Sequence, residues 1–103
     1  MKITLLYFDG CPNWRPTLED IRTVLKDHHV GVETELLKVT SKKQAQEMAF
    51  LGSPTVRVDG VDVEPGIPET GFGIECRLYW VEGRVLGRPP VEWIAAAVES
   101  AAG

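Results

Sequence analysis

An Asp-Gly pair, Asp59-Gly60, separates two short valine-rich segments at residues 55–58 and 61–64. Asp and Gly tolerate the positive φ angles of a type I′ turn, so the pair predicts a two-residue β-hairpin. On one face of this hairpin the register aligns four valines: Val56, Val58, Val61 and Val63. On the other face, Arg57 lies opposite Asp62, which predicts a cross-strand pair of opposite charge.

The amino-terminal third combines an apolar run with a helical pattern. Residues 3–8 are almost continuously apolar, which is typical of a strand buried on both faces. From Trp14 apolar residues recur every three or four positions, so the sequence predicts an amphipathic helix that ends near residue 29. Asn13 is the expected helix cap, and Pro16 lies in the first turn, where its missing N–H costs little.

The rest of the chain completes an α/β pattern. Further elements are predicted as a strand over 32–39, a short helix over 41–51, a strand over 77–81 and a closing helix over 91–102. Residues 65–75 are rich in Gly and Pro and predict a loop. The strand–helix–strand start implies a parallel pair with a right-handed crossover, and the hairpin adds antiparallel strands. We therefore predict one α/β domain over residues 1–103, with a mixed sheet flanked by helices in the order β-α-β-α-β-β, then an extra strand and a C-terminal helix.

Charge and composition exclude several classes of function. The chain has 103 residues, with 11 Lys and Arg against 15 Asp and Glu. Because neither sign dominates, we expect neither a nucleic-acid nor a membrane partner. No apolar run approaches the roughly 20 residues of a membrane span, and the first residues do not resemble a signal peptide, which predicts a cytoplasmic protein. Two cysteines are too few for a disulfide scaffold, so their reactivity becomes the main question.

Cys11 lies between the predicted first strand and the predicted first helix. Ligands of open α/β sheets bind beyond the carboxyl ends of strands, which favours this position for chemistry. The amino terminus of a helix also favours the thiolate over the thiol, and the thiolate is the nucleophile. Pro12 removes one competing backbone N–H. The alternative interpretation is that Cys11 is a small buried hydrophobic residue.

The segment Cys11-Pro12-Asn13-Trp14 resembles the active-site turn of thioredoxin-like proteins, and its Cys-Pro start is most similar to the glutaredoxin branch. Gly52-Ser53-Pro54-Thr55-Val56 resembles the cis-proline loop of the same proteins. The resemblance implies a thioredoxin-like fold and a cis Ser53-Pro54 bond beside Cys11. In the family, the residue before this proline pairs through its backbone with a substrate peptide or with glutathione. The substrate-binding residues that the resemblance implies are Pro12, Asn13, Trp14, Ser53, Pro54 and Thr55.

Two features depart from the family pattern. Trp14 stands where dithiol members have a second cysteine, so no disulfide can form within this motif. The helical spacing also favours a packing role for Trp14. Residues 64–69 lack the Gly-Gly-x-x-Asp-like element with which glutaredoxins hold glutathione, so the resemblance does not extend to glutathione recognition.

Cys76 is the second thiol, at the end of the glycine-rich loop. If this loop folds over the Cys11 turn, Cys76 could resolve a mixed disulfide or join Cys11 in a dithiolate site for a soft metal. Otherwise Cys76 is a half-buried strand residue. The leading hypothesis is thiol–disulfide exchange with a protein disulfide or a small thiol, with Cys11 as nucleophile. The alternatives are a non-enzymatic thioredoxin-like binding module and a soft-metal or mercurial-binding dithiol protein.

The sequence predicts no cofactor and no metal ligand set. His28-His29 lies at the end of the predicted helix and has no metal-ligand spacing with the cysteines. Asp9 is near enough in sequence to accept a proton from Cys11, or it belongs to an Asp-Gly turn. Trp80 and Trp93 are predicted core or interface residues, and exposure of both would favour a homodimer face.

Overall fold

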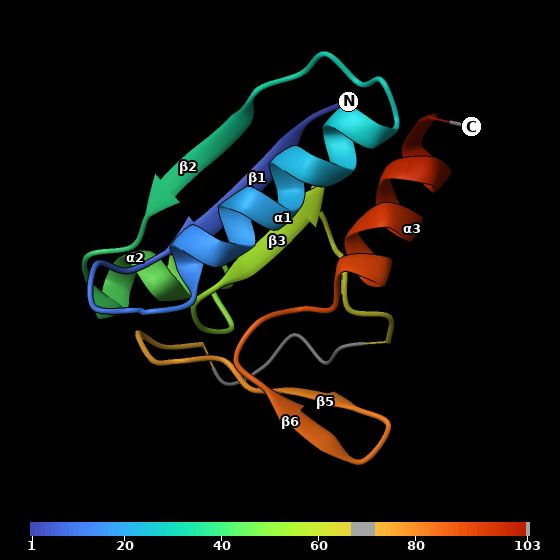
Figure 1. Ribbon diagram of the computed structural model, residues 1–103. Helices are drawn as coiled ribbons and strands as arrows, with labels where there is room; N and C mark the ends of the chain where they lie inside the picture. The colour runs from blue at the N-terminus through green and yellow to red at the C-terminus, as the bar shows by residue number, and fades with distance from the viewer. Residues whose placement is uncertain (67–71, 103) are drawn as a thin grey trace.

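Four strands form one mixed sheet in the order β2-β1-β3-β4, and Figure 1 labels the first three of them. In the computed structural model, which describes residues 1–66 and 72–102, β1 (Ile3–Tyr7) pairs in parallel with β2 (Thr34–Lys38). The other neighbour of β1 is the antiparallel strand β3 (Thr55–Val58), which leads into β4 (Val61–Asp62). The predicted α/β fold with a mixed sheet and one parallel pair is confirmed. Part of the predicted 65–75 loop lies outside the described residues.

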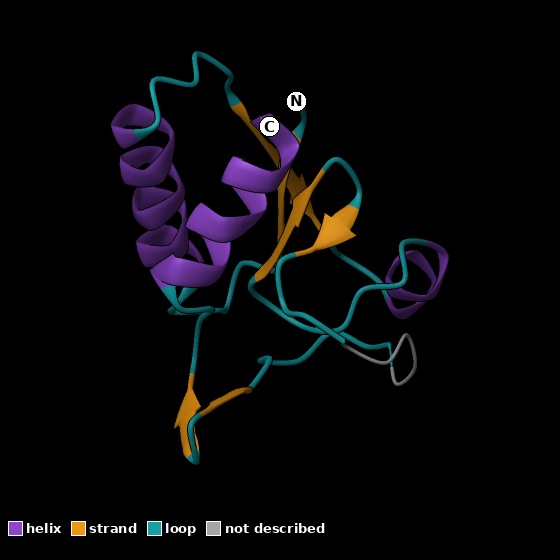
Figure 2. Cartoon of the chain, turned by 90° about the vertical axis from the view of Figure 1, so that its right-hand side faces the viewer, coloured by secondary structure: helices purple, strands orange, loops and turns teal. Residues whose placement is uncertain are grey.

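Helices cover both faces of the sheet (Figure 2). One face packs against α1 (Trp14–Asp27) and α3 (Val91–Ala102), and the other against α2 (Lys42–Glu47) and the turn that follows it. Strand β1 contributes to both cores, as predicted: Ile3 and Leu5 belong to the α1–α3 side, and Leu6 belongs to the side of Phe50. None of the helices in the described part of the chain is long and apolar enough to cross a membrane.

The predicted hairpin forms with the expected register. Val58 pairs with Val61 across a turn in which Asp59 and Gly60 have φ angles of 51° and 81°. Three of the four aligned valines are buried, whereas Val61 is 69% exposed because it lies beside the turn on an edge strand. Arg57 lies opposite Asp62, as predicted, but the two side chains bind other partners. Arg57 donates to the carbonyls of residues 48 and 49, while Asp62 accepts from Arg77.

Two helix ends differ from the expectation. Asn13 occupies the N-cap position of α1, but its side chain makes no capping hydrogen bond. Its carbonyl instead accepts from both the N–H and the hydroxyl of Thr17, at 3.2 and 2.7 Å. Helix α2 ends at Glu47 rather than at residue 51, because the chain turns at Ala49 (φ 52°). This turn lets Phe50 enter the core.

The strand predicted over residues 77–81 does not extend the main sheet. It becomes β5 (Tyr79–Val81), which pairs with β6 (Arg84–Leu86) in a separate hairpin that projects from the body (Figure 2). Burial alternates along β5: Tyr79 packs into the domain, whereas Trp80 is 66% exposed. Trp93 packs against the core, so the two tryptophans do not form one exposed face.

His28 links the end of α1 to α3. Its Nδ1 lies 2.9 Å from the carbonyl of Val24, and its Nε2 lies 2.9 Å from Glu99 Oε1. The hydrogen bond to Glu99, and then the one to Val24, raise the pKa of His28 above its ordinary value. The protonated imidazole is therefore favoured in the folded state. Its stabilising contribution is complete below the unfolded pKa of about 6.5 and is lost as the pH rises through the folded pKa.

We expect the substitution Glu99→Gln to destabilise the protein more at acidic than at alkaline pH. The difference in unfolding free energy between wild type and Glu99→Gln should be largest below about pH 6.5 and shrink above the raised His28 pKa. Urea unfolding across this range measures it. Glu92→Gln, at an exposed glutamate in the first turn of the same helix, is the control. A Glu99→Gln effect that does not vary with pH would contradict the linkage.

Candidate functional site

Cys11 follows the carboxyl end of β1 and precedes α1, as predicted. Its backbone N–H donates to the carbonyl of Phe8 at 3.2 Å, which closes the turn after the strand. Residue 11 lies two positions before Asn13, the N-cap residue of α1. Cys11 is only 4% exposed, so its thiol is sheltered rather than presented openly to solvent.

The proline loop lies at the same end of the sheet. Leu6 is the register partner of Thr55, so the residues directly before β3 face the segment that follows β1 (Figure 1). The Ser53-Pro54 peptide bond is cis, as the resemblance implies. Ser53 and Thr55 are fully buried, and the Thr55 hydroxyl donates to the carbonyl of Gly52 at 2.6 Å. The loop is therefore a fixed part of the core.

Residues 75–77 run beside this loop and pair with it. Ser53 donates its N–H to the carbonyl of Glu75 at 2.9 Å, and its own carbonyl accepts the N–H of Arg77 at 2.9 Å. These two bonds form a parallel bridge in which exposed Cys76 is the partner of Ser53. Both backbone groups of Ser53 are thus used within the chain.

Gly52 permits this close approach. Its φ angle is +118°, a conformation that side chains rarely adopt. A Cβ at this position would lie 3.0 Å from the Cβ of Arg77 and 3.0 Å from the carbonyl oxygen of Glu75. The glycine that begins the proline loop therefore lets residues 75–77 pack against it.

A buried ion-pair cluster anchors the paired segment. The Arg77 side chain is 4% exposed and binds Asp62 through two nitrogens, at 2.7 and 3.1 Å. It also contacts Glu64 at 3.1 Å and the Thr55 hydroxyl at 3.0 Å. Burial alone would lower the pKa of Arg77, but the hydrogen bonds and charges of the acidic neighbours outweigh it and raise the pKa. Arg77 stays charged and joins the hairpin to the proline loop.

Tyr79 connects these parts to Cys11. Its hydroxyl is fully buried and donates to the carbonyl of Pro54, and the Arg77 guanidinium lies 4.4 Å from its ring. Burial is the main cause that raises the pKa of Tyr79. Arg77 opposes this shift, while the carboxylates and the charge of a Cys11 thiolate add to it. Cys11 is therefore within electrostatic reach of a phenol that remains protonated at neutral pH.

The other residues of the predicted turn have different surroundings. Trp14 stacks on Tyr7 with a centroid separation of 4.2 Å, and Arg15 lies 4.9 Å from the Trp14 ring. The ring also packs against the core, which supports a packing role for Trp14. Pro12 is exposed, and the Asn13 side chain contacts the backbone at Gly87.

Asp9, the acidic residue nearest to Cys11 in sequence, binds a lysine. Asp9 lies 2.5 Å from Lys38 Nζ, and this hydrogen bond and charge raise the pKa of Lys38. Asp9 is therefore engaged with Lys38 rather than with Cys11.

Both cysteines are free thiols. Within residues 1–66 and 72–102, no group of three or more His, Cys, Asp or Glu side chains is arranged to hold a metal ion.

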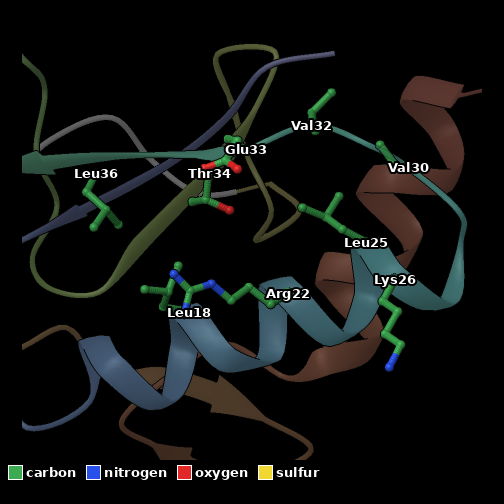
Figure 3. Close-up of a pocket in the computed structure, with 9 residues that line it drawn as sticks. All are labelled: Leu18, Arg22, Leu25, Lys26, Val30, Val32, Glu33, Thr34 and Leu36. Carbon is green, nitrogen blue, oxygen red and sulfur yellow. The ribbon is translucent and has the colours of Figure 1, made fainter.

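A surface groove lies elsewhere on the molecule, between α1 and the segment that leads into β2 (Figure 3). Leu18, Leu25 and Val32 give it apolar walls, and Arg22 and Lys26 add positive charge. None of the predicted site residues lines this groove, so it is separate from the Cys11 region.

Comparisons with models of protein families, with curated proteins and with solved structures find no match for this chain. The thioredoxin-like resemblance and the thiol chemistry therefore stay predictions. The observation relevant to both predictions is that three features lie at one end of the sheet: Cys11, the cis Ser53-Pro54 bond and the segment that carries Cys76. Sequence reasoning missed Arg77 and Tyr79, which hold that end together.

Proposed function

We propose that this is a thioredoxin-like protein that carries out thiol–disulfide exchange, with Cys11 as nucleophile and Cys76 as the resolving thiol. The parallel bridge is the observation that carries the proposal, because it fixes Cys76 opposite Ser53, directly before the cis bond to Pro54. The pairing of β1 with β3 puts this bond at the end of the sheet where Cys11 follows β1. Two free thiols on segments far apart in sequence thus share one end of the fold.

The proposed reaction has two exchange steps. The Cys11 thiolate attacks one sulfur of a substrate disulfide, forms a mixed disulfide and releases the other sulfur as a thiolate. The Cys76 thiolate then attacks the Cys11 sulfur, which forms a Cys11–Cys76 disulfide and releases the second substrate thiolate. An external dithiol returns the pair to two thiols by the same chemistry.

The surroundings of Cys11 suit the first step. Cys11 follows the carboxyl end of β1 and lies two residues before Asn13, the N-cap residue of α1. The buried Tyr79 hydroxyl is already committed to the Pro54 carbonyl and keeps its proton, so it adds no negative charge beside the thiolate.

A turnover assay tests the proposal. We expect the purified chain to accelerate the reduction of bis(2-hydroxyethyl) disulfide by dithiothreitol, measured as release of 2-mercaptoethanol by chromatography. A sample of the protein with both thiols alkylated is the control for unspecific effects. No rate above this control would overturn the proposal and favour a binding module, the role that Trp14 in place of a second cysteine suggests.

A further inference from the structure

We infer that the exchange site acts on small-molecule disulfides and excludes extended peptides, because residues 75–77 already fill the backbone edge beside the proline loop. This inference rests on the proposed function and specifies its substrate class. It depends on backbone hydrogen bonds and buried contacts that involve neither thiol.

An extended peptide binds a sheet or loop edge by strand addition, which needs a free N–H and a free C=O on the protein. Strands β1 and β3 are the two interior strands of the main sheet. Ser53 is therefore the residue whose backbone would be offered to a peptide. Its N–H and its C=O are both bonded at 2.9 Å to residues 75 and 77 of the same chain.

The covering segment is held at several points. Gly73 donates its N–H to the carbonyl of Phe50 at 3.1 Å, so the pairing begins before Glu75. Beyond the bridge, the buried Arg77 side chain binds Asp62, and the Tyr79 hydroxyl bonds to Pro54. A peptide that replaced this segment would have to break backbone bonds and uncover a buried cation together.

A small disulfide does not meet this obstacle. It has no extended backbone to pair, so it needs only access for one sulfur atom. The shelter around Cys11, which is 4% exposed, also favours a narrow substrate over a bulky one. The paired backbone edge beside Ser53 therefore selects substrates by size and shape. It does not change the chemistry of thiol–disulfide exchange.

The decisive comparison uses two disulfides that share one half, 2-mercaptoethanol. One is bis(2-hydroxyethyl) disulfide, and the other is an unstructured decapeptide whose single cysteine is disulfide-bonded to 2-mercaptoethanol. With wild-type protein and dithiothreitol, we expect kcat/KM for the peptide to be at least about tenfold lower. An equal or higher value for the peptide would overturn the inference and leave the proposed function standing. No turnover of either compound would overturn both.

Amide hydrogen exchange gives a readout that is independent of activity. We expect the N–H groups of Ser53 and Arg77 to be strongly protected in the wild-type protein, and rapid exchange at both would overturn the inference. Gly52→Ala should displace residues 75–77 and raise the peptide-to-small-disulfide ratio of kcat/KM. Gly60→Ala is the matched control, because Gly60 also has a positive φ but a Cβ added there would meet no atom within 4 Å.

Discussion

Replacing Cys11 by serine should abolish the proposed turnover of bis(2-hydroxyethyl) disulfide, whereas replacing Cys76 by serine should leave a mixed disulfide on Cys11. A serine hydroxyl stays protonated at neutral pH and does not attack a disulfide, so the first step is lost in Cys11→Ser. In Cys76→Ser the first step proceeds, but only an external thiol can release the product. Turnover of this variant should therefore be slower and should rise with the concentration of dithiothreitol.

Intact-mass spectrometry separates the two roles. After incubation with the substrate and without reductant, Cys76→Ser should gain the mass of one 2-mercaptoethanol adduct, while the wild type should form an internal disulfide. Circular dichroism spectra of both variants control for folding. Turnover by Cys11→Ser close to that of the wild type would show that exposed Cys76, not sheltered Cys11, makes the first attack.

The parts of the fold that the sequence predicts well depend on neighbours along the chain. The hairpin rests on Asp59-Gly60 and on alternation within a few residues, and its register is correct. The apolar run of β1 signals burial on both faces without any knowledge of its partners. The position of Cys11 follows from the same local succession of strand, turn and helix.

The contacts that complete the site join residues far apart in the sequence. The local pattern of apolar and polar residues therefore does not reveal them. The cross-strand neighbour of Asp62 is Arg57, as predicted, but the side chain that binds Asp62 is Arg77, from beyond the glycine-rich loop. The bridge between Ser53 and Cys76 forms where Gly52, with its φ of +118°, lets residues 75–77 approach the proline loop. Only an alternation of residues signals that this segment has a buried face. Arg77 and Tyr79 point to the buried side, and Leu78 and Trp80 are exposed on the other side.

Arg77→Met should cause the largest loss of stability among these substitutions, about 3–5 kcal/mol of unfolding free energy. Methionine fills similar space but leaves the Asp62 and Glu64 carboxylates, which are 12% and 24% exposed, without their cation. The Thr55 hydroxyl also loses its donor. Urea unfolding measures the change. Arg22→Met, at a pair with Glu19 whose side chains are 62% and 70% exposed, should cost less than about 1 kcal/mol.

Most of the expected loss of unfolding free energy comes from the two carboxylates that are left without a cation, rather than from lost packing. Adding Asp62→Asn and Glu64→Gln to Arg77→Met removes both charges while keeping similar shapes, so it should restore part of the lost unfolding free energy. A single-variant loss below about 1 kcal/mol, as for an exposed pair, would contradict the buried cluster. A large loss without recovery in the triple variant would assign the role of Arg77 to packing on Tyr79 and the proline loop. The backbone N–H of Arg77 also donates to the carbonyl of Ser53, and the triple variant keeps this bond available. If the triple variant recovers stability and its residue 77 amide stays protected from hydrogen exchange, the bridge holds without the ion pair.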